Sequence, residues 1–150
     1  MTLSTHAVVG ASIAVLSKVN PVLAFFLGFG SHFILDSIPH WDYKVTKKNI
    51  TVDVFFGVIL VFVFFYSSSF SFHSLVFSAA LWGAFGAVLP DLLIGFHMKF
   101  PTKLVSFLHR FHIEIIHSKT RLDHMTYMGP LMQFVFIAIT IYLVRYYAVM

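Results

Sequence analysis

The sequence of 150 residues contains no cysteine and few charged residues. Without cysteine there is neither a disulfide nor a thiolate metal site, so any metal must be held by histidine and carboxylate groups. Asp, Glu, Lys and Arg make up 11% of the chain, whereas a soluble domain contains about 25%. Since 59% of the residues are hydrophobic and the mean hydropathy is +0.87, the composition predicts an integral membrane protein.

Two further features bear on partners and processing. No Lys or Arg precedes the first apolar run and no A-x-A-like site follows it, so we expect no cleavable signal peptide. The sequence pI near 9.5 raises the possibility of nucleic-acid binding. The basic residues, however, flank apolar segments, where such residues set membrane topology. The lipid bilayer is therefore the expected partner, and nucleic acid is not.

Apolar runs separated by turns predict an all-α, polytopic membrane helix bundle with a single domain, residues 1–150. The expected membrane helices are residues 6–16, 21–38, 50–66, 73–89 and 130–148. The first two are short for a span of about 20 residues and form a helical hairpin. Residues 103–117 carry apolar and polar side chains on opposite helical faces, which predicts an amphipathic helix in the membrane interface.

Helix ends are predicted from capping and proline chemistry. Ser4 or Thr5 is expected to cap the first helix. Pro39 and Pro90 are expected to end the second and fourth helices, because proline lacks a backbone N–H. Asp53 lies near the start of its own helix, where a carboxylate complements the helix dipole.

The distribution of charge predicts the orientation. With five helices, Lys18 and Arg145 fall on the side opposite the N-terminus. The other eight basic residues share its side: Lys44, Lys47, Lys48, Lys99, Lys103, Arg110, Lys119 and Arg121. The positive-inside rule makes the N-terminal side cytoplasmic. All six acidic residues and eight of the nine histidines fall on that side.

The end of the second apolar helix combines groups that bind cations. His32 and Asp36 are four residues apart, so they lie on one face of a helix. His40 and Asp42 follow in the turn after Pro39. An imidazole and a carboxylate are costly to bury in an apolar helix without a partner, so other parts of the chain are expected to contribute one.

The helical hairpin indicates where a partner lies. If its turn is centred on Val19, His6 lies 13 residues before that point and His32 lies 13 after it. In antiparallel helices the two histidines then have the same height, about 20 Å above the turn. If the turn lies at the far interface of a core about 30 Å thick, this height is within the near leaflet.

Asp91, His112 and His117 are expected to reach the same region from other helices. We predict a divalent metal, zinc by preference, because zinc accepts imidazole and carboxylate ligands and leaves a position for water. The predicted metal ligands are His6, His32, Asp36, Asp91, His112 and His117. The predicted catalytic residues are Asp91, as a general base, and His40, in proton transfer.

Other interpretations stay open. The His32–Asp36 pair is also compatible with an interhelical hydrogen bond that stabilises the bundle, and His6 with a residue of the helix start alone. A non-catalytic protein that binds metal ions or protons would use the same residues. A His-box iron oxygenase acting on lipid is a further alternative, since His109 and His112 have the spacing of such boxes.

Three segments resemble small bacterial inner-membrane proteins described as membrane-bound metal-dependent hydrolases. These segments are THAVVGA (5–11), SHFILDSIPHWDY (31–43) and GAVLPD (86–91). Residues 110–118 are similar to the downstream histidine motif of those proteins. His32, Asp36 and His40 also loosely resemble the H-x-x-x-D…P-x-H stretch of zinc-dependent phospholipases C. The resemblance implies a multi-pass protein of the bacterial inner membrane that hydrolyses a phosphoester, of lipid or nucleotide type. A homodimer is compatible with a chain of this size.

Overall fold

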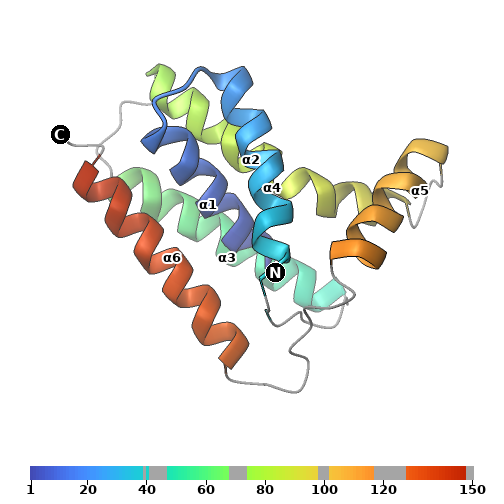
Figure 1. Cartoon of the computed structure of the whole chain (residues 1–150). Helices are drawn as coiled ribbons and strands as arrows, with labels where there is room; N and C mark the ends of the chain where they lie inside the picture. Colours follow the sequence, from blue (N-terminus) through green and yellow to red (C-terminus); the bar gives the residue numbers. More distant parts are fainter. Residues whose placement is uncertain (39, 41–46, 68–73, 98–101, 117–127, 148–150) are drawn as a thin grey trace.

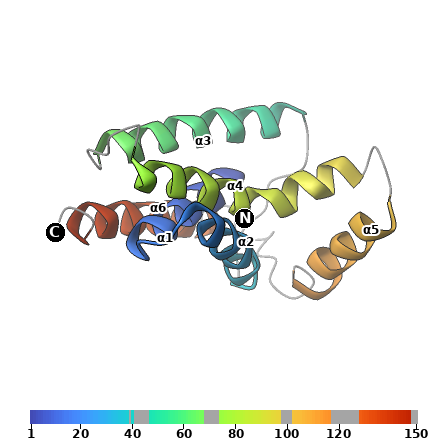
Figure 2. The same ribbon diagram turned by 90° about the horizontal axis from the view of Figure 1, so that it is seen from above.

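The computed structural model describes residues 1–38, 40, 47–67, 74–97, 102–116 and 128–147. Their elements are the helices α1 (Leu3–Leu16), α2 (Pro21–Asp36), α3 (Lys47–Ser67), α4 (Leu75–His97), α5 (Lys103–Arg110) and α6 (Met128–Tyr147), with the π-helical turn η1 (Phe111–Ile116) after α5. All these elements are helical, which confirms the expected all-α class. Helices α5 and η1 lie on one side of the molecule and α6 lies on another (Figures 1 and 2).

Two of the described helices are long and apolar enough to cross a membrane. They are α4, over residues Leu75–Gly95, and α6, over residues Pro130–Tyr147. Helices α1 and α2 are apolar but have only 14 and 16 residues, as expected for a short hairpin. By length and composition, α4 and α6 support an association with a membrane.

Helix α1 is capped by residues from two parts of the chain. It begins at Leu3 rather than at His6, and its N-cap is Thr2, so the expectation of Ser4 or Thr5 is wrong. Asp53 of α3 accepts hydrogen bonds from the backbone N–H groups of Leu3 (2.8 Å) and Ser4 (3.2 Å). The carboxylate thus complements the dipole of α1 rather than that of its own helix, since α3 starts at Lys47, six residues before Asp53.

Glycines bring α1, α2 and α4 into backbone contact. We call Gly10, Gly28, Gly83 and Gly86 the glycine seam. A Cβ atom added to Gly10 or Gly28 would overlap the carbonyl oxygen of Gly83, and one added to Gly86 would overlap that of Phe25. Small residues at helix interfaces permit this close approach, as is common in membrane helices. The three helices therefore form a tight core, and the polar residues of α1 and α2 gather at one end of it.

Two further expected helix boundaries are wrong. Helix α4 does not end at Pro90 but continues to His97, and it changes direction along its length (Figure 2). A proline removes one backbone hydrogen bond and bends a helix, which neighbouring helices tolerate in apolar bundles. The amphipathic helix expected over residues 103–117 is regular only to Arg110, after which the backbone widens into η1.

Candidate metal centre

Side chains from four parts of the chain meet at one end of the three-helix core. His6 comes from α1, His32 and Asp36 come from the last turns of α2, and His40 follows α2. All four side chains are fully buried. His112 of η1 is also buried, with 2% of its surface exposed, so most of this polar cluster is removed from solvent.

Four of the residues form a group with the dimensions of a metal site. One potential ligand atom from each of His32, Asp36, Asp91 and His112 lies within 4.8 Å of the others. The Nε2 atoms of His32 and His112 lie 3.2 and 3.4 Å from Asp36 Oδ2, and 3.9 and 3.7 Å from Asp91 Oδ1. Metal–ligand bonds of 2.0–2.2 Å in a tetrahedral zinc site place ligand atoms about 3.3 Å apart. The group is therefore close to the size that one cation requires.

A backbone contact from α4 orients His32. Its Nδ1 lies 2.7 Å from the carbonyl oxygen of Ala87. Donating a proton there leaves Nε2 unprotonated, so that it can accept a hydrogen bond from His112 Nδ1, 3.3 Å away, or act as a ligand. Ala87 lies in the turn that precedes Pro90, next to Gly86, whose carbonyl would otherwise accept the N–H that Pro90 lacks. The proline thus disturbs the helix at the turn that holds the imidazole.

His40 is oriented in the same manner by the carbonyl group of Ile38. Its Nδ1 lies 2.7 Å from the carbonyl oxygen of Ile38, and its Nε2 lies 3.6 Å from Asp36 Oδ1. On this side of the carboxylate lie two further nitrogens, the Nε2 of His6 at 3.1 Å and the amino group of Met1 at 2.9 Å. Asp36 is consequently the common contact of the whole cluster.

Most of the predicted site residues converge. His6, His32, Asp36, Asp91 and His112 share this region, with His40 beside them. The equal height expected for His6 and His32 is confirmed, because their rings stack with centroids 4.1 Å apart. His117 lies outside the described residues.

Two contacts were not expected from the sequence. The amino group of Met1 is not a side chain, so no residue pattern indicated it. The Ala87 carbonyl had one indirect signal, the proline three residues after it.

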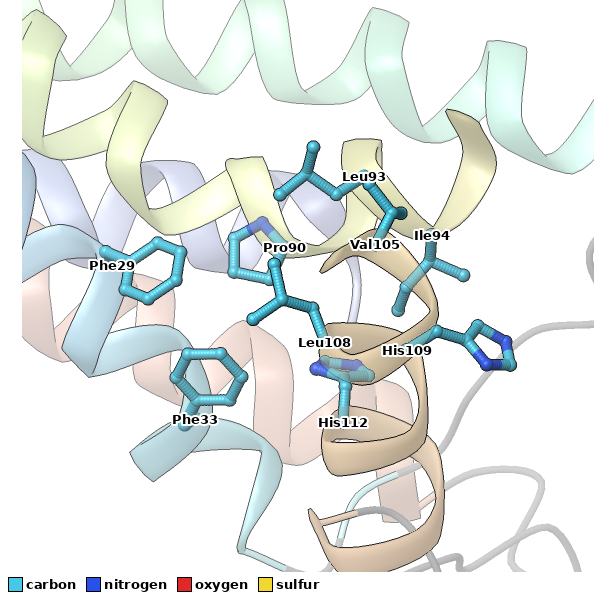
Figure 3. Close-up of a pocket in the computed structure, with 9 residues that line it drawn as sticks. All are labelled: Phe29, Phe33, Pro90, Leu93, Ile94, Val105, Leu108, His109 and His112. Atoms are coloured by element: carbon cyan, nitrogen blue, oxygen red, sulfur yellow. The ribbon is translucent and has the colours of Figure 1, made fainter. Parts of the chain in front are cut away.

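Apolar side chains surround the cluster on the side of α5. A small pocket beside His112 is lined by Phe29 and Phe33 of α2, by Pro90 and neighbouring residues of α4, and by Leu108 (Figure 3). The His109 ring extends from α5 in a different direction from that of His112 (Figure 3). Apolar walls lower the local dielectric constant and strengthen the interactions of any charge in the cluster.

The sequence matches no protein-family model and no curated protein, and the fold matches no solved structure. The chemistry of the cluster is therefore argued from its own geometry. Asp91, whose side chain is 26% exposed, is the member of the four-residue group that solvent reaches most easily. A cation held here would have buried imidazole ligands on one side and a partly exposed carboxylate on the other.

Proposed function

We propose that this protein is a membrane-embedded, metal-dependent hydrolase with zinc as its preferred metal. The observation that carries the proposal is the burial of His32, His112 and Asp36, whose ligand atoms lie within 4.8 Å of one another and of an Asp91 carboxylate oxygen. Buried ionisable groups are unfavourable unless they pair or coordinate metal, and within membrane helices they most often serve function.

The residues of the cluster have distinct roles in this proposal. Bound divalent metal makes a coordinated water molecule nucleophilic near neutral pH. His32, His112 and Asp36 hold the cation, and the Ala87 carbonyl keeps the His32 ring in place. Asp91 is reachable from solvent, which suits a carboxylate that orients the attacking water or accepts its proton. His40, whose Nε2 lies 3.6 Å from Asp36, is placed to assist in proton transfer.

The membrane arrangement is also part of the proposal. We place five helices in a bacterial inner membrane, with the N-terminus in the cytoplasm and α5 at the interface. In support, α3 has 21 residues, a length of about 31 Å, and its Phe55, Phe56 and Phe62 are exposed. A site at this end of the bundle lies within the cytoplasmic leaflet, which favours a phosphoester or another lipid-linked substrate.

A second candidate function is metal binding without catalysis. It is favoured by the burial of His6, His32 and Asp36, none of which is exposed, because substrate must reach the metal for hydrolysis. The oxygenase hypothesis has less support, since His109 lies outside the four-residue group that His112 joins.

Metal content tests the proposal first. We would purify the full chain in detergent and measure bound metals by ICP-MS in the wild type, His32→Ala and Asp36→Ala. His109→Ala is the matched control, because it removes a histidine from the same region but not from the cluster. Zinc that is bound by the wild type and the control, and lost from the other two variants, supports the proposed site. No metal in any sample would leave the cluster a structural hydrogen-bond network and end the proposal.

Activity separates the two candidate functions. Zinc-loaded protein would be assayed with phosphate monoesters, phosphate diesters and lipid phosphoesters, beside Asp91→Asn. Hydrolysis by the wild type that falls at least tenfold in Asp91→Asn, with zinc retained, supports the hydrolase. Zinc without hydrolysis of any of these compounds supports the binding protein, and bound iron in place of zinc supports the oxygenase.

A further inference from the structure

The two oxygens of the Asp36 carboxylate face different sets of nitrogens. Oδ2 lies 3.2 Å from the Nε2 of His32 and 3.4 Å from that of His112. Oδ1 lies 3.1 Å from the Nε2 of His6 and 3.6 Å from that of His40. The four imidazoles are thus divided between the two ends of one buried carboxylate. The proposed function requires one cation on the Oδ2 side and assigns no function to the Oδ1 side.

We infer that Oδ1 belongs to a second cation site, formed with His6 and His40, so that Asp36 bridges two divalent metal ions. This inference rests on the proposed function, which requires only the site on the Oδ2 side. Paired catalytic metals in hydrolases lie about 3.5–4 Å apart, a spacing that the two oxygens of one carboxylate can bridge.

His6 provides an observation independent of the acidic residues. Its side chain is fully buried, yet neither Nδ1 nor Nε2 makes a hydrogen bond to any residue that the structure describes. Nε2 lies 3.1 Å from Asp36 Oδ1, but the two groups are not aligned as donor and acceptor. Buried polar atoms are nearly always satisfied. A cation bound by both Nε2 and Asp36 Oδ1 would give Nε2 a partner.

His40 repeats the arrangement of His32 on the opposite side of Asp36. In each residue Nδ1 lies 2.7 Å from a backbone carbonyl, that of Ile38 for His40 and that of Ala87 for His32. In each, Nε2 is directed to the carboxylate. Metal-binding histidines are commonly held by such a contact through their second nitrogen. An imidazole on each side of Asp36 therefore has the orientation that is common among metal-binding histidines.

The amino group of Met1 is the competitor for this second site. It lies 2.9 Å from Asp36 Oδ1, with both groups buried, and as an ammonium it is itself the positive charge that Oδ1 needs. A second metal ion must displace it, or be coordinated by it after it loses a proton. The experiment must therefore distinguish a metal on Oδ1 from this ammonium.

A bridged pair of metals suits phosphoesters, the substrate class that the proposed function favours. Two ions can stabilise both the attacking and the leaving oxygen in an in-line displacement at phosphorus. In that reaction the water oxygen bonds to phosphorus as the ester P–O bond breaks. A water proton passes to a carboxylate such as Asp91, and the leaving oxygen takes a proton from solvent.

The test is the number of metal ions that each chain binds. The full chain in detergent is loaded with zinc, freed of excess metal and analysed by ICP-MS. We expect two equivalents in the wild type and in the control His109→Ala, and one in His40→Ala. His6→Phe should also bind one, since phenylalanine keeps a ring that can stack on His32 but has no ligand atom. Asp36→Asn should bind none.

A second measurement reports on the bridge itself. With manganese in place of zinc, the wild type should give the EPR signal of an exchange-coupled pair, whereas His6→Phe should give that of an isolated ion. If His6→Phe does not purify as a monodisperse species, His6→Gln replaces it in both measurements.

The outcomes separate this inference from the proposed function. A single metal ion in the wild type, retained in His6→Phe and His40→Ala but lost in His32→Ala, overturns the second site. It would assign Oδ1 to the Met1 ammonium and leave the proposed function standing. The absence of metal from the wild type would overturn both.

Discussion

The cluster of histidines and aspartates around Asp36 and the glycine seam connect the same helices in opposite ways. At the seam, Gly10, Gly28 and Gly83 have no side chains, so the backbones of α1, α2 and α4 touch directly. At the cluster, large polar side chains such as His6, His32 and Asp36 fill the space between helices. Backbone packing stabilises an apolar bundle, whereas burying ionisable groups costs free energy unless they are paired. The seam therefore explains why the helices associate, whereas apolar packing does not explain the cluster.

The seam also determines the geometry of the cluster. Gly10 of α1 and Gly28 of α2 both lie against Gly83 of α4. His6 lies four residues before Gly10 and His32 lies four residues after Gly28, so about one turn of helix separates each histidine from its glycine contact. The stacking of these two rings at 4.1 Å thus depends on helices held together elsewhere. Substitutions that change the seam or the cluster, but not both, can test the contribution of each region to stability and metal binding.

The largest effect is expected at the seam. Gly83→Leu would place a Cβ 2.8 Å from that of Ala14 and against the Gly10 carbonyl, forcing α1 and α4 apart. Overpacking of this kind costs about 1–3 kcal/mol or more, so we expect little monodisperse protein by size-exclusion chromatography in detergent. Gly30→Ala is the control, because a Cβ there meets no atom within 4 Å. It should raise the stability of α2, by about 1 kcal/mol.

The next effect is expected at the cluster and depends on metal. A ligand present at 100 times its dissociation constant stabilises a protein by about 2.7 kcal/mol. Zinc should therefore raise the thermal midpoint of the wild type and of Gly30→Ala by equal amounts, and that of Asp36→Asn not at all. An equal shift in Asp36→Asn would show that zinc binds elsewhere.

A smaller effect is expected where α3 caps α1. Asp53→Ala removes the acceptor of hydrogen bonds from Leu3 N–H, Ser4 N–H and Ser4 Oγ. Loss of a helix cap costs about 0.5–2 kcal/mol, and the first turn of α1 carries His6. We expect a lower thermal midpoint in metal-free protein and weaker zinc binding. Asp53→Asn retains one carbonyl acceptor, so its thermal midpoint and its zinc affinity should fall less than those of Asp53→Ala. Equal decreases in the two variants would argue against capping.

The smallest effect is expected from His109→Ala. This side chain is half-buried on α5 and lies outside the four-residue group, so its removal should change the free energy of unfolding by about 1 kcal/mol or less. Zinc content by ICP-MS should stay at the wild-type value, whereas His112→Ala, three residues further on, should lower it. A loss of zinc from both variants would mean that α5 and η1 contribute to the site as a unit.

The features that depend on local periodicity and composition could be predicted from the sequence. Apolar runs indicated the helices, the four-residue spacing placed His32 and Asp36 on one face, and the length of the hairpin predicted the height of His6. These are properties of single helices or of adjacent ones, where chain geometry leaves few choices. Part of the candidate site could therefore be predicted without a structure.

How these parts meet depends on long-range packing, which the sequence pattern did not predict. The course of α4 through Pro90 depends on the helices around it, and the capping of α1 by Asp53 joins positions about 50 residues apart. The division of the Asp36 oxygens between two pairs of histidines likewise depends on where η1 and the chain start are packed. Such contacts follow from interhelical packing. The glycine seam brings the helices close enough for the cluster to form. The periodicity of one helix contains no information about contacts between helices.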